Sequence, residues 1–219
     1  LNAIGLQGPG VDGFARNYMP FLRTTGVPVI VNIWGTDESE YVEVARRLSE
    51  VEGVSGLELN ISCPNVKEGG SAFGTDPRTA ASLVAAVRRA TTLPLMPKLA
   101  PNVPDIKVFV RAAQDAGADA LSMINTLPAM AIDIETRRPV LANKVGGLSG
   151  SAVHPVAVKL VWEAAQVARV PILAMGGIMG PEQAVEFMLA GAAAVAVGTA
   201  NFIDPSVCLR VIDGIEEYM

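Results

Sequence analysis

The stretch VPILAMGGIMGPEQAVEFMLAGAAAVAVGTA, residues 170–200, contains the unit from which the rest of the chain is built. Its apolar runs predict strands over 170–175 and 193–197, and the amphipathic segment 181–190, which opens with a proline, predicts a helix between them. Glycines follow each strand directly, Gly176 and Gly177 after the first and Gly198 after the second. Because backbone N–H groups without a covering side chain can bind an anion, we expect a phosphate site at these two strand ends.

The same unit recurs along the chain. Further strands are predicted over 27–33, 56–61, 93–99 and 120–124, and further helices over 38–48, 77–90, 105–116, 155–168 and 205–217. Such alternation indicates an α/β fold of parallel strands, either an open doubly wound sheet or a (β/α)8 barrel. Barrels commonly bind phosphate after strands seven and eight. We therefore predict a TIM-type (β/α)8 barrel, one domain over 1–219, whose first two strands are missing from the front. The connection 126–151 is predicted to be a long irregular functional loop.

Composition narrows the classes of function. The chain has 219 residues, 50% of them hydrophobic, and a formal net charge of −5 without a run of Lys or Arg, which argues against nucleic acid as a partner. The sequence lacks an apolar run of the ~18 residues that cross a membrane and a signal-peptide pattern, so we expect a cytoplasmic protein. Two cysteines and one histidine predict neither a disulfide framework nor a zinc site.

Chemistry is expected where the strand in LELNISCPNV, residues 57–66, ends in polar side chains. Pro64 stops the strand, so Cys63 should stand at its C-terminal edge, where ligands bind in parallel α/β folds. A free cysteine is more often a small buried residue, which is our expectation for Cys208 in an apolar helical stretch. Lys98 interrupts another apolar strand and would need an anion nearby. His154, beside Pro155, is expected to be a capping or surface residue.

Seven ordered motifs span the whole chain: NAIGL at 2–6, ELNISCPNV at 58–66, PKLAPN at 97–102, INTL at 124–127, GGLSG at 146–150, MGGI at 175–178 and VGTANF at 197–202. Together they resemble class 1 dihydroorotate dehydrogenase. The residues 67–70 and 73–74 after the cysteine are most similar to the catalytic subunit of the NAD-dependent 1B branch. The resemblance implies a barrel that binds FMN and oxidises dihydroorotate to orotate in the biosynthesis of UMP.

The resemblance also implies residue roles. Cys63 would be the catalytic base that takes the C5 proton while FMN accepts the C6 hydride. Substrate contacts are expected from Asn2, Ala3, Ile4, Gly5, Leu6, Asn60, Asn65, Asn125 and Thr126, and FMN contacts from Asn32, Asn60, Lys98, Ile124, Gly150, Gly176, Gly177, Gly198 and Thr199. No metal is expected on this chain. The implied assembly is a homodimer joined to a subunit with FAD and a 2Fe-2S cluster, a heterotetramer.

Two alternatives stay open. Dihydropyrimidine dehydrogenase, a related flavoenzyme, shares the Asn-x-Ser-Cys-Pro arrangement found at residues 60–64. The chain could also be a barrel fragment without activity of its own, because a barrel that lacks two strands exposes long strand edges.

Overall fold

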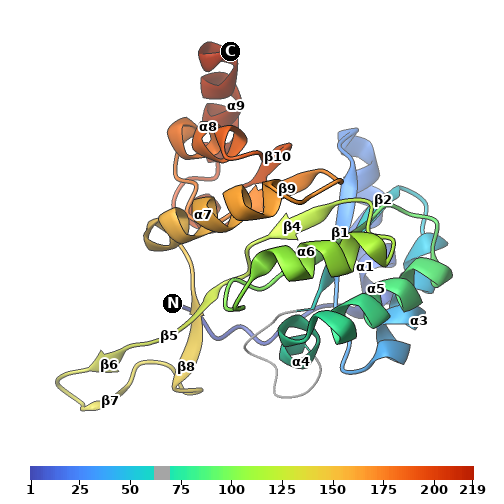
Figure 1. Cartoon of the computed structure of the whole chain (residues 1–219), viewed down its shortest axis with the longest axis horizontal. Coiled ribbons are helices and arrows are strands. Elements are labelled where there is room, and N and C mark those ends of the chain that lie inside the picture. Colours follow the sequence, from blue (N-terminus) through green and yellow to red (C-terminus); the bar gives the residue numbers. More distant parts are fainter. Residues whose placement is uncertain (62–69) are drawn as a thin grey trace.

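A computed structural model describes residues 1–61 and 70–219 of the chain, with the side chains of 70–72 left out (Figure 1). Its centre is a parallel sheet in the order β1-β2-β3-β4-β9-β10. All six predicted strands are confirmed, within a few residues at their ends: β1 Val29–Ile33, β2 Val54–Asn60, β3 Leu95–Leu99, β4 Leu121–Met123, β9 Ile172–Met175 and β10 Ala194–Ala196.

The six predicted helices are also confirmed, each following its strand along the chain: α3 Glu38–Ser49, α5 Pro77–Ala90, α6 Ile106–Asp115, α7 His154–Ala165, α8 Pro181–Leu189 and α9 Val207–Tyr218. Aspartates begin three of them. The carboxylates of Asp37, Asp76 and Asp105 accept backbone N–H groups of the first turns of α3, α5 and α6. These side chains bond N–H groups that have no partner within the helix, and so fix where each helix starts.

Alternation along the strands divides the core from the concave face of the sheet. In β2, Leu57 and Leu59 are fully buried in the hydrophobic core, whereas Glu58 and Asn60, which alternate with them, lie on the other face. The hydroxyl of Tyr41, from α3, donates a hydrogen bond of 2.7 Å to the carbonyl of Asn60. This bond ties the end of β2 to the helix layer, and so the polar residues of β2 keep a fixed position on the concave face.

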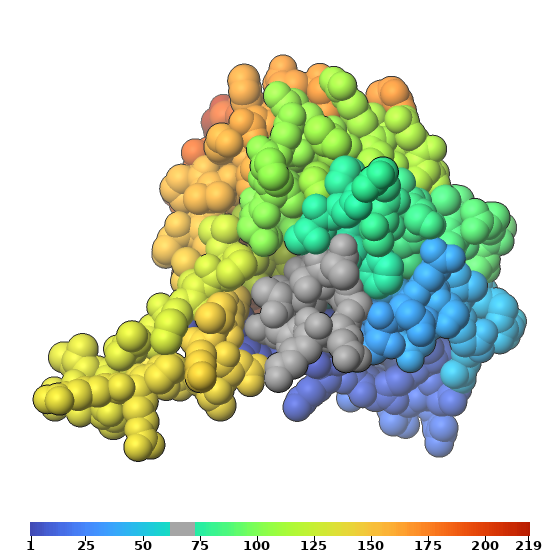
Figure 2. Space-filling view, turned by 60° about the horizontal axis from the view of Figure 1, so that its bottom comes forward, coloured from blue at the N-terminus to red at the C-terminus, as the bar shows by residue number. Residues whose placement is uncertain are grey.

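The connection predicted as an irregular loop is a β-ribbon, so that prediction was wrong. β5 Leu127–Met130 pairs antiparallel with β8 Val145–Leu148, and beyond them β6 Ile132–Asp133 pairs with β7 Arg138–Pro139. The ribbon projects away from the body of the molecule (Figure 2). Its turn is closed by the carboxylate of Asp133, which accepts the N–H groups of Glu135 and Thr136.

The N-terminal segment also forms structure that we did not predict. It contains α1 Gly10–Asn17 and α2 Met19–Leu22, and a further helix, α4 Gly70–Thr75, precedes α5. Asn2 reaches the ribbon: its N–H donates to the carbonyl of Gly147 at 3.0 Å, and the N–H of Gly147 donates back at 2.7 Å. In the part of the chain that the structure describes, no helix has the length and apolar character needed to span a membrane.

Candidate active site

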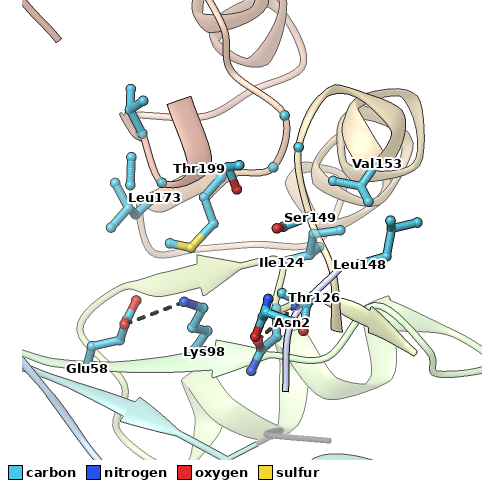
Figure 3. A pocket seen from close by; sticks show the side chains of 18 of the residues that line it. Asn2, Glu58, Lys98, Ile124, Thr126, Leu148, Ser149, Val153, Leu173 and Thr199 are labelled. Atoms are coloured by element: carbon cyan, nitrogen blue, oxygen red, sulfur yellow. Dashed lines mark hydrogen bonds and ion pairs between the residues drawn. The ribbon is translucent and has the colours of Figure 1, made fainter. Parts of the chain in front are cut away.

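A cavity of about 530 Å³ lies on the concave face of the sheet, around the C-terminal ends of β4, β9 and β10 (Figure 3). Parts of the chain far apart in sequence line it. They are the N-terminal segment, the inward positions of β2 and β3, the segment after β4, the end of the ribbon, and the turns after β9 and β10. This is the side of a parallel sheet on which ligands bind, so the cavity is the candidate active site.

The turn after β9 and the residue that ends the ribbon form a wall of bare backbone. Gly176 and Gly177 have φ of 137° and 73°, and Gly150 has φ of 90°. A Cβ on Gly177 would lie 2.8 Å from the carbonyl oxygen of Gly150 and from Cβ of His154. Both the positive φ and this close approach require glycine.

Lys98 and Glu58 face one another across neighbouring strands of the cavity floor. The Nζ of Lys98 lies 3.9 Å from Oε2 of Glu58, and the two side chains are 20% and 12% exposed. The amide Nδ2 of Asn32 also donates to Oε2 of Glu58. Within the protein, Lys98 thus has a carboxylate as its anionic partner, and the lysine is held inside the cavity, as Figure 3 shows.

Amide side chains form a further wall of the cavity, beside Lys98. Nδ2 of Asn125 donates to Oδ1 of Asn60 at 3.1 Å, and Oδ1 of Asn125 accepts the N–H of Thr126 at 2.8 Å. Asn2 arrives beside them through its bonds to Gly147. Gly147 leaves room for Thr126, whose Oγ1 would lie 2.2 Å from an added Cβ. Neutral donors and acceptors therefore converge here from three distant motifs.

Most of the predicted site residues line this one cavity: Asn2, Ile4, Lys98, Ile124, Asn125, Thr126, Gly150, Gly176, Gly177, Gly198 and Thr199. Asn60 reaches the cavity through its bond to Asn125. Leu6 and Asn32 instead line a neighbouring cavity of about 390 Å³ under α1, and Ala3 and Gly5 line neither. Cys63 and Asn65 lie outside the described residues.

Several lining residues were not predicted. Glu58 is the most consequential, and its signal was available, because it is a charged residue in an apolar strand just as Lys98 is. The others are mainly apolar and include Met96, Leu173 and Met175, which occupy the inward positions of their strands. They give the cavity an apolar floor that suits a flat ring.

Two predictions about single residues were wrong. His154 is buried, with 8% of its surface exposed, and its ring bonds other elements and does not cap the helix that it begins. Cys208 is exposed, and its Sγ donates to Oδ1 of Asn201 at 3.5 Å. The helix that carries Cys208 turns Val207 and Val211 to the core, and the next position round the helix faces outward.

The family model for dihydroorotate dehydrogenase matches residues 1–219. The chain belongs to the dihydroorotate dehydrogenase family. Curated relatives agree: the chain is 57% identical to a protein of Geotalea daltonii and 55% identical to one of Geotalea uraniireducens, over 219 residues in each case. Both are named the catalytic subunit of dihydroorotate dehydrogenase B (NAD(+)), and the alignment covers all of this chain and 72% of each relative. The resemblance drawn from the motifs is confirmed.

A solved dihydroorotate dehydrogenase supports the fold. The enzyme of Eimeria tenella, in complex with ferulenol, matches with a TM-score of 0.83 at 24% identity, over 100% of this chain and 66% of that chain. At this identity the match speaks for the fold alone. The predicted barrel architecture is confirmed in the form of a curled parallel sheet with six of the eight strands.

Proposed function

We propose that this protein oxidises dihydroorotate to orotate, as the FMN-dependent catalytic subunit of a dihydroorotate dehydrogenase of the B type. The observation that carries the proposal is the convergence of neutral amides, one lysine and a glycine wall in a single cavity of a member of this family. A pyrimidine ring alternates carbonyl and N–H groups along its edge, which amide side chains match better than charged ones. We propose residues 1–219 as one FMN-binding domain.

The lining fits FMN. The glycines at 150, 176, 177 and 198, with Thr199, offer backbone N–H groups for a phosphate, and the apolar floor from Leu173 and Met175 suits the isoalloxazine ring. Bound FMN would supply an acceptor for the hydride from C6 of the substrate. Lys98, fixed by Glu58, places a positive charge where negative charge would increase, and so stabilises it. Asn32 lies outside the main cavity and reaches it only through Glu58.

The substrate side is assigned to the amide wall. Asn60 and Asn125 hold each other in place, and their remaining donor and acceptor positions are directed by that bond. Asn2, seated on the ribbon through Gly147, completes the wall. The ring of a substrate held between this wall and the apolar floor would be oriented before any bond changes. Such orientation lowers the barrier to reaction.

The proton acceptor is proposed to be the thiolate of Cys63, on the basis of the family motif. A free thiol titrates near pH 8.5, so the rate of substrate oxidation is expected to rise toward alkaline pH. Cys63→Ser should leave the affinity for FMN within about threefold of wild type and slow flavin reduction by dihydroorotate at pH 7 by about 100-fold or more, because a hydroxyl is a much weaker base.

The test follows the flavin spectrum of the full chain, loaded with FMN, on mixing with dihydroorotate or dihydrouracil. Bleaching by dihydroorotate alone supports the proposal, whereas bleaching by dihydrouracil alone would assign the chain to pyrimidine reduction. An unchanged rate in Cys63→Ser would remove the cysteine from its role. If the chain neither melts cooperatively nor binds FMN, it is an inactive fragment.

We further propose a cytoplasmic assembly in which a homodimer of this chain joins a subunit carrying FAD and a 2Fe-2S cluster, with NAD+ as the final acceptor. The support is the name of the curated relatives, which are catalytic subunits of an NAD-linked enzyme. The chain alone, supplied with dihydroorotate, should not reduce NAD+, and addition of such a subunit should start NADH formation. NADH formation by the chain alone would contradict this.

A further inference from the structure

His154, the one histidine of the sequence, connects two elements behind the glycine turn. Its Nδ1 lies 2.9 Å from the carbonyl oxygen of Gly176, and its Nε2 lies 2.9 Å from Oε2 of Glu186 on α8. The ring stands edge-on to Phe187 with 4.8 Å between centroids. His154 lies in none of the seven family motifs, yet its ring is held on three sides.

The carbonyl of Gly176 determines the role of one ring nitrogen. A carbonyl oxygen only accepts, so Nδ1 of His154 donates to Gly176. The contact of Nε2 with Glu186, whose side chain is 56% exposed, holds the ring on its other side.

The bond to Gly176 fixes the direction of the next N–H group. In a trans peptide the C=O of one residue and the N–H of the following residue point to opposite sides. The N–H of Gly177 is therefore directed away from His154, which does not line the cavity, while Gly176 and Gly177 do. Among the residues that the structure describes, this N–H has no acceptor. It is free to donate to a ligand.

The glycine turn presents no charged side chain to the cavity. The charged side chains among the described lining are Glu58 and Lys98, which pair with each other. The backbone N–H groups of the turn are therefore the donors that it offers to an anion.

We propose that His154 is a positioning residue that orients the Gly176–Gly177 peptide for an anionic group. This inference rests on the proposed function, since the anion would be the phosphate of FMN. His154 would act only through the peptide. It would therefore affect binding of the phosphate and not the chemistry of the flavin ring.

The test compares two substitutions with two ligands on the full chain. The amide nitrogen of Asn takes roughly the place of Nδ1, and that of Gln roughly the place of Nε2. His154→Asn should keep the Gly176 bond and bind FMN within about threefold of wild type. His154→Gln should keep only the Glu186 bond and raise the dissociation constant for FMN about tenfold, the effect of one lost hydrogen bond.

Riboflavin, which lacks the phosphate, is the control ligand. Its dissociation constant, measured like that of FMN by quenching of flavin fluorescence, should change less than about twofold in both variants. Equal weakening of FMN and riboflavin in both variants would assign His154 a merely structural role and overturn the proposal. So would a His154→Gln variant that binds FMN as wild type does.

The hydrogen bond of the ring has its own readout. Because the chain has a single histidine, a long-range ¹H–¹⁵N spectrum of wild type reports only His154. Nδ1 should show the chemical shift of a protonated nitrogen, and an unprotonated Nδ1 would refute the bond to Gly176. Wild type that binds no FMN would refute the proposed function and the phosphate assignment with it, while the spectrum still decides whether the bond to Gly176 is present.

Discussion

Gly177 has a tightly constrained backbone at the site. Its φ of 73° and the 2.8 Å approach of the Gly150 carbonyl leave no room for a side chain. Gly177→Ala should destabilise the fold by about 1–3 kcal/mol, because the left-handed backbone and the close contact both oppose a Cβ. Gly8→Ala is the matched control, since nothing lies within 4 Å of its added Cβ. Thermal melts of the two variants should differ; equal melting temperatures would contradict the description of this turn.

Ser122 carries a hydroxyl that is buried without a partner. Its Oγ is inaccessible, and in the described part of the chain it forms no hydrogen bond. Ser122→Ala should keep the free energy of unfolding or raise it by up to about 1 kcal/mol, because an unsatisfied polar group is removed. Ser55→Ala, which loses the bond from the N–H of Val29, should lower it by about 0.5–1 kcal/mol. Denaturant titrations measure both, and a loss of stability in Ser122→Ala would show that its hydroxyl is satisfied.

The difference between Lys98 and Glu58 shows where prediction from sequence stopped. Both are charged residues in apolar strands and both lie within family motifs, but only the lysine was predicted to be a site residue. Whether the alternate face of β2 meets water or the inside of a barrel depends on how the sheet curls, and the sequence of one strand does not contain that information. For the same reason the burial of His154 was missed: its partner Glu186 lies 32 positions further along the chain.

At the scale of elements, the aspartate caps make the helices sensitive to acid. The hydroxyl of Ser39 and the N–H of Glu40 hold the pKa of Asp37 below its ordinary value, and the N–H of Arg78 does the same for Asp76. A lowered pKa in the folded state means that this stabilisation is complete above the ordinary value, near pH 4, and is lost as the pH falls further. The melting temperature should therefore decrease as the pH is lowered below about 4.

Substitution separates the caps from other acid effects. Asp37→Asn keeps a capping side chain without the titrating charge, so its melting temperature should depend less on pH below 4 than that of wild type. Asp213→Asn, in the middle of α9, is the control and should follow the wild-type curve. Parallel pH curves for wild type and Asp37→Asn would contradict a role of the cap.

Elements with a regular period were predictable, and the ribbon was not. Each helix that follows a strand shows apolar periodicity and most begin at Asp or Pro, which is why all six were found. The strands of the ribbon are two to four residues long and contain Gly146, Gly147 and Pro139, residues that favour turns when read locally. Their pairing, and that of Asn2 with them, arises from contacts across the chain. The helix α1 was not predicted because it contains Gly10 and Gly13, and glycine disfavours a helix when the sequence is read locally.

For the molecule as a whole, the order of the strands in the sheet predicts which amide hydrogens are protected from exchange with solvent. β3 is hydrogen-bonded on both sides, to β2 and β4, whereas β10 pairs in the described structure with β9 alone. Amide hydrogens of β3 should exchange more slowly than those of β10, because an edge strand opens without breaking a second ladder. Hydrogen exchange followed by mass spectrometry measures this, and equal rates in the two strands would mean that β10 is covered in solution.

The pairing of Asn2 with Gly147 makes the substrate wall a strongly non-local structure. The hydrogen bond joins residues 145 positions apart, and the chain between them contains the strands that bear Asn60 and Lys98 and, just after β4, Asn125. Closing so long a loop has a large entropic cost until the intervening strands are in place. During synthesis or refolding, no fragment that stops short of Gly147 can complete this wall, so affinity for substrate should arise late, after most of the sheet has formed.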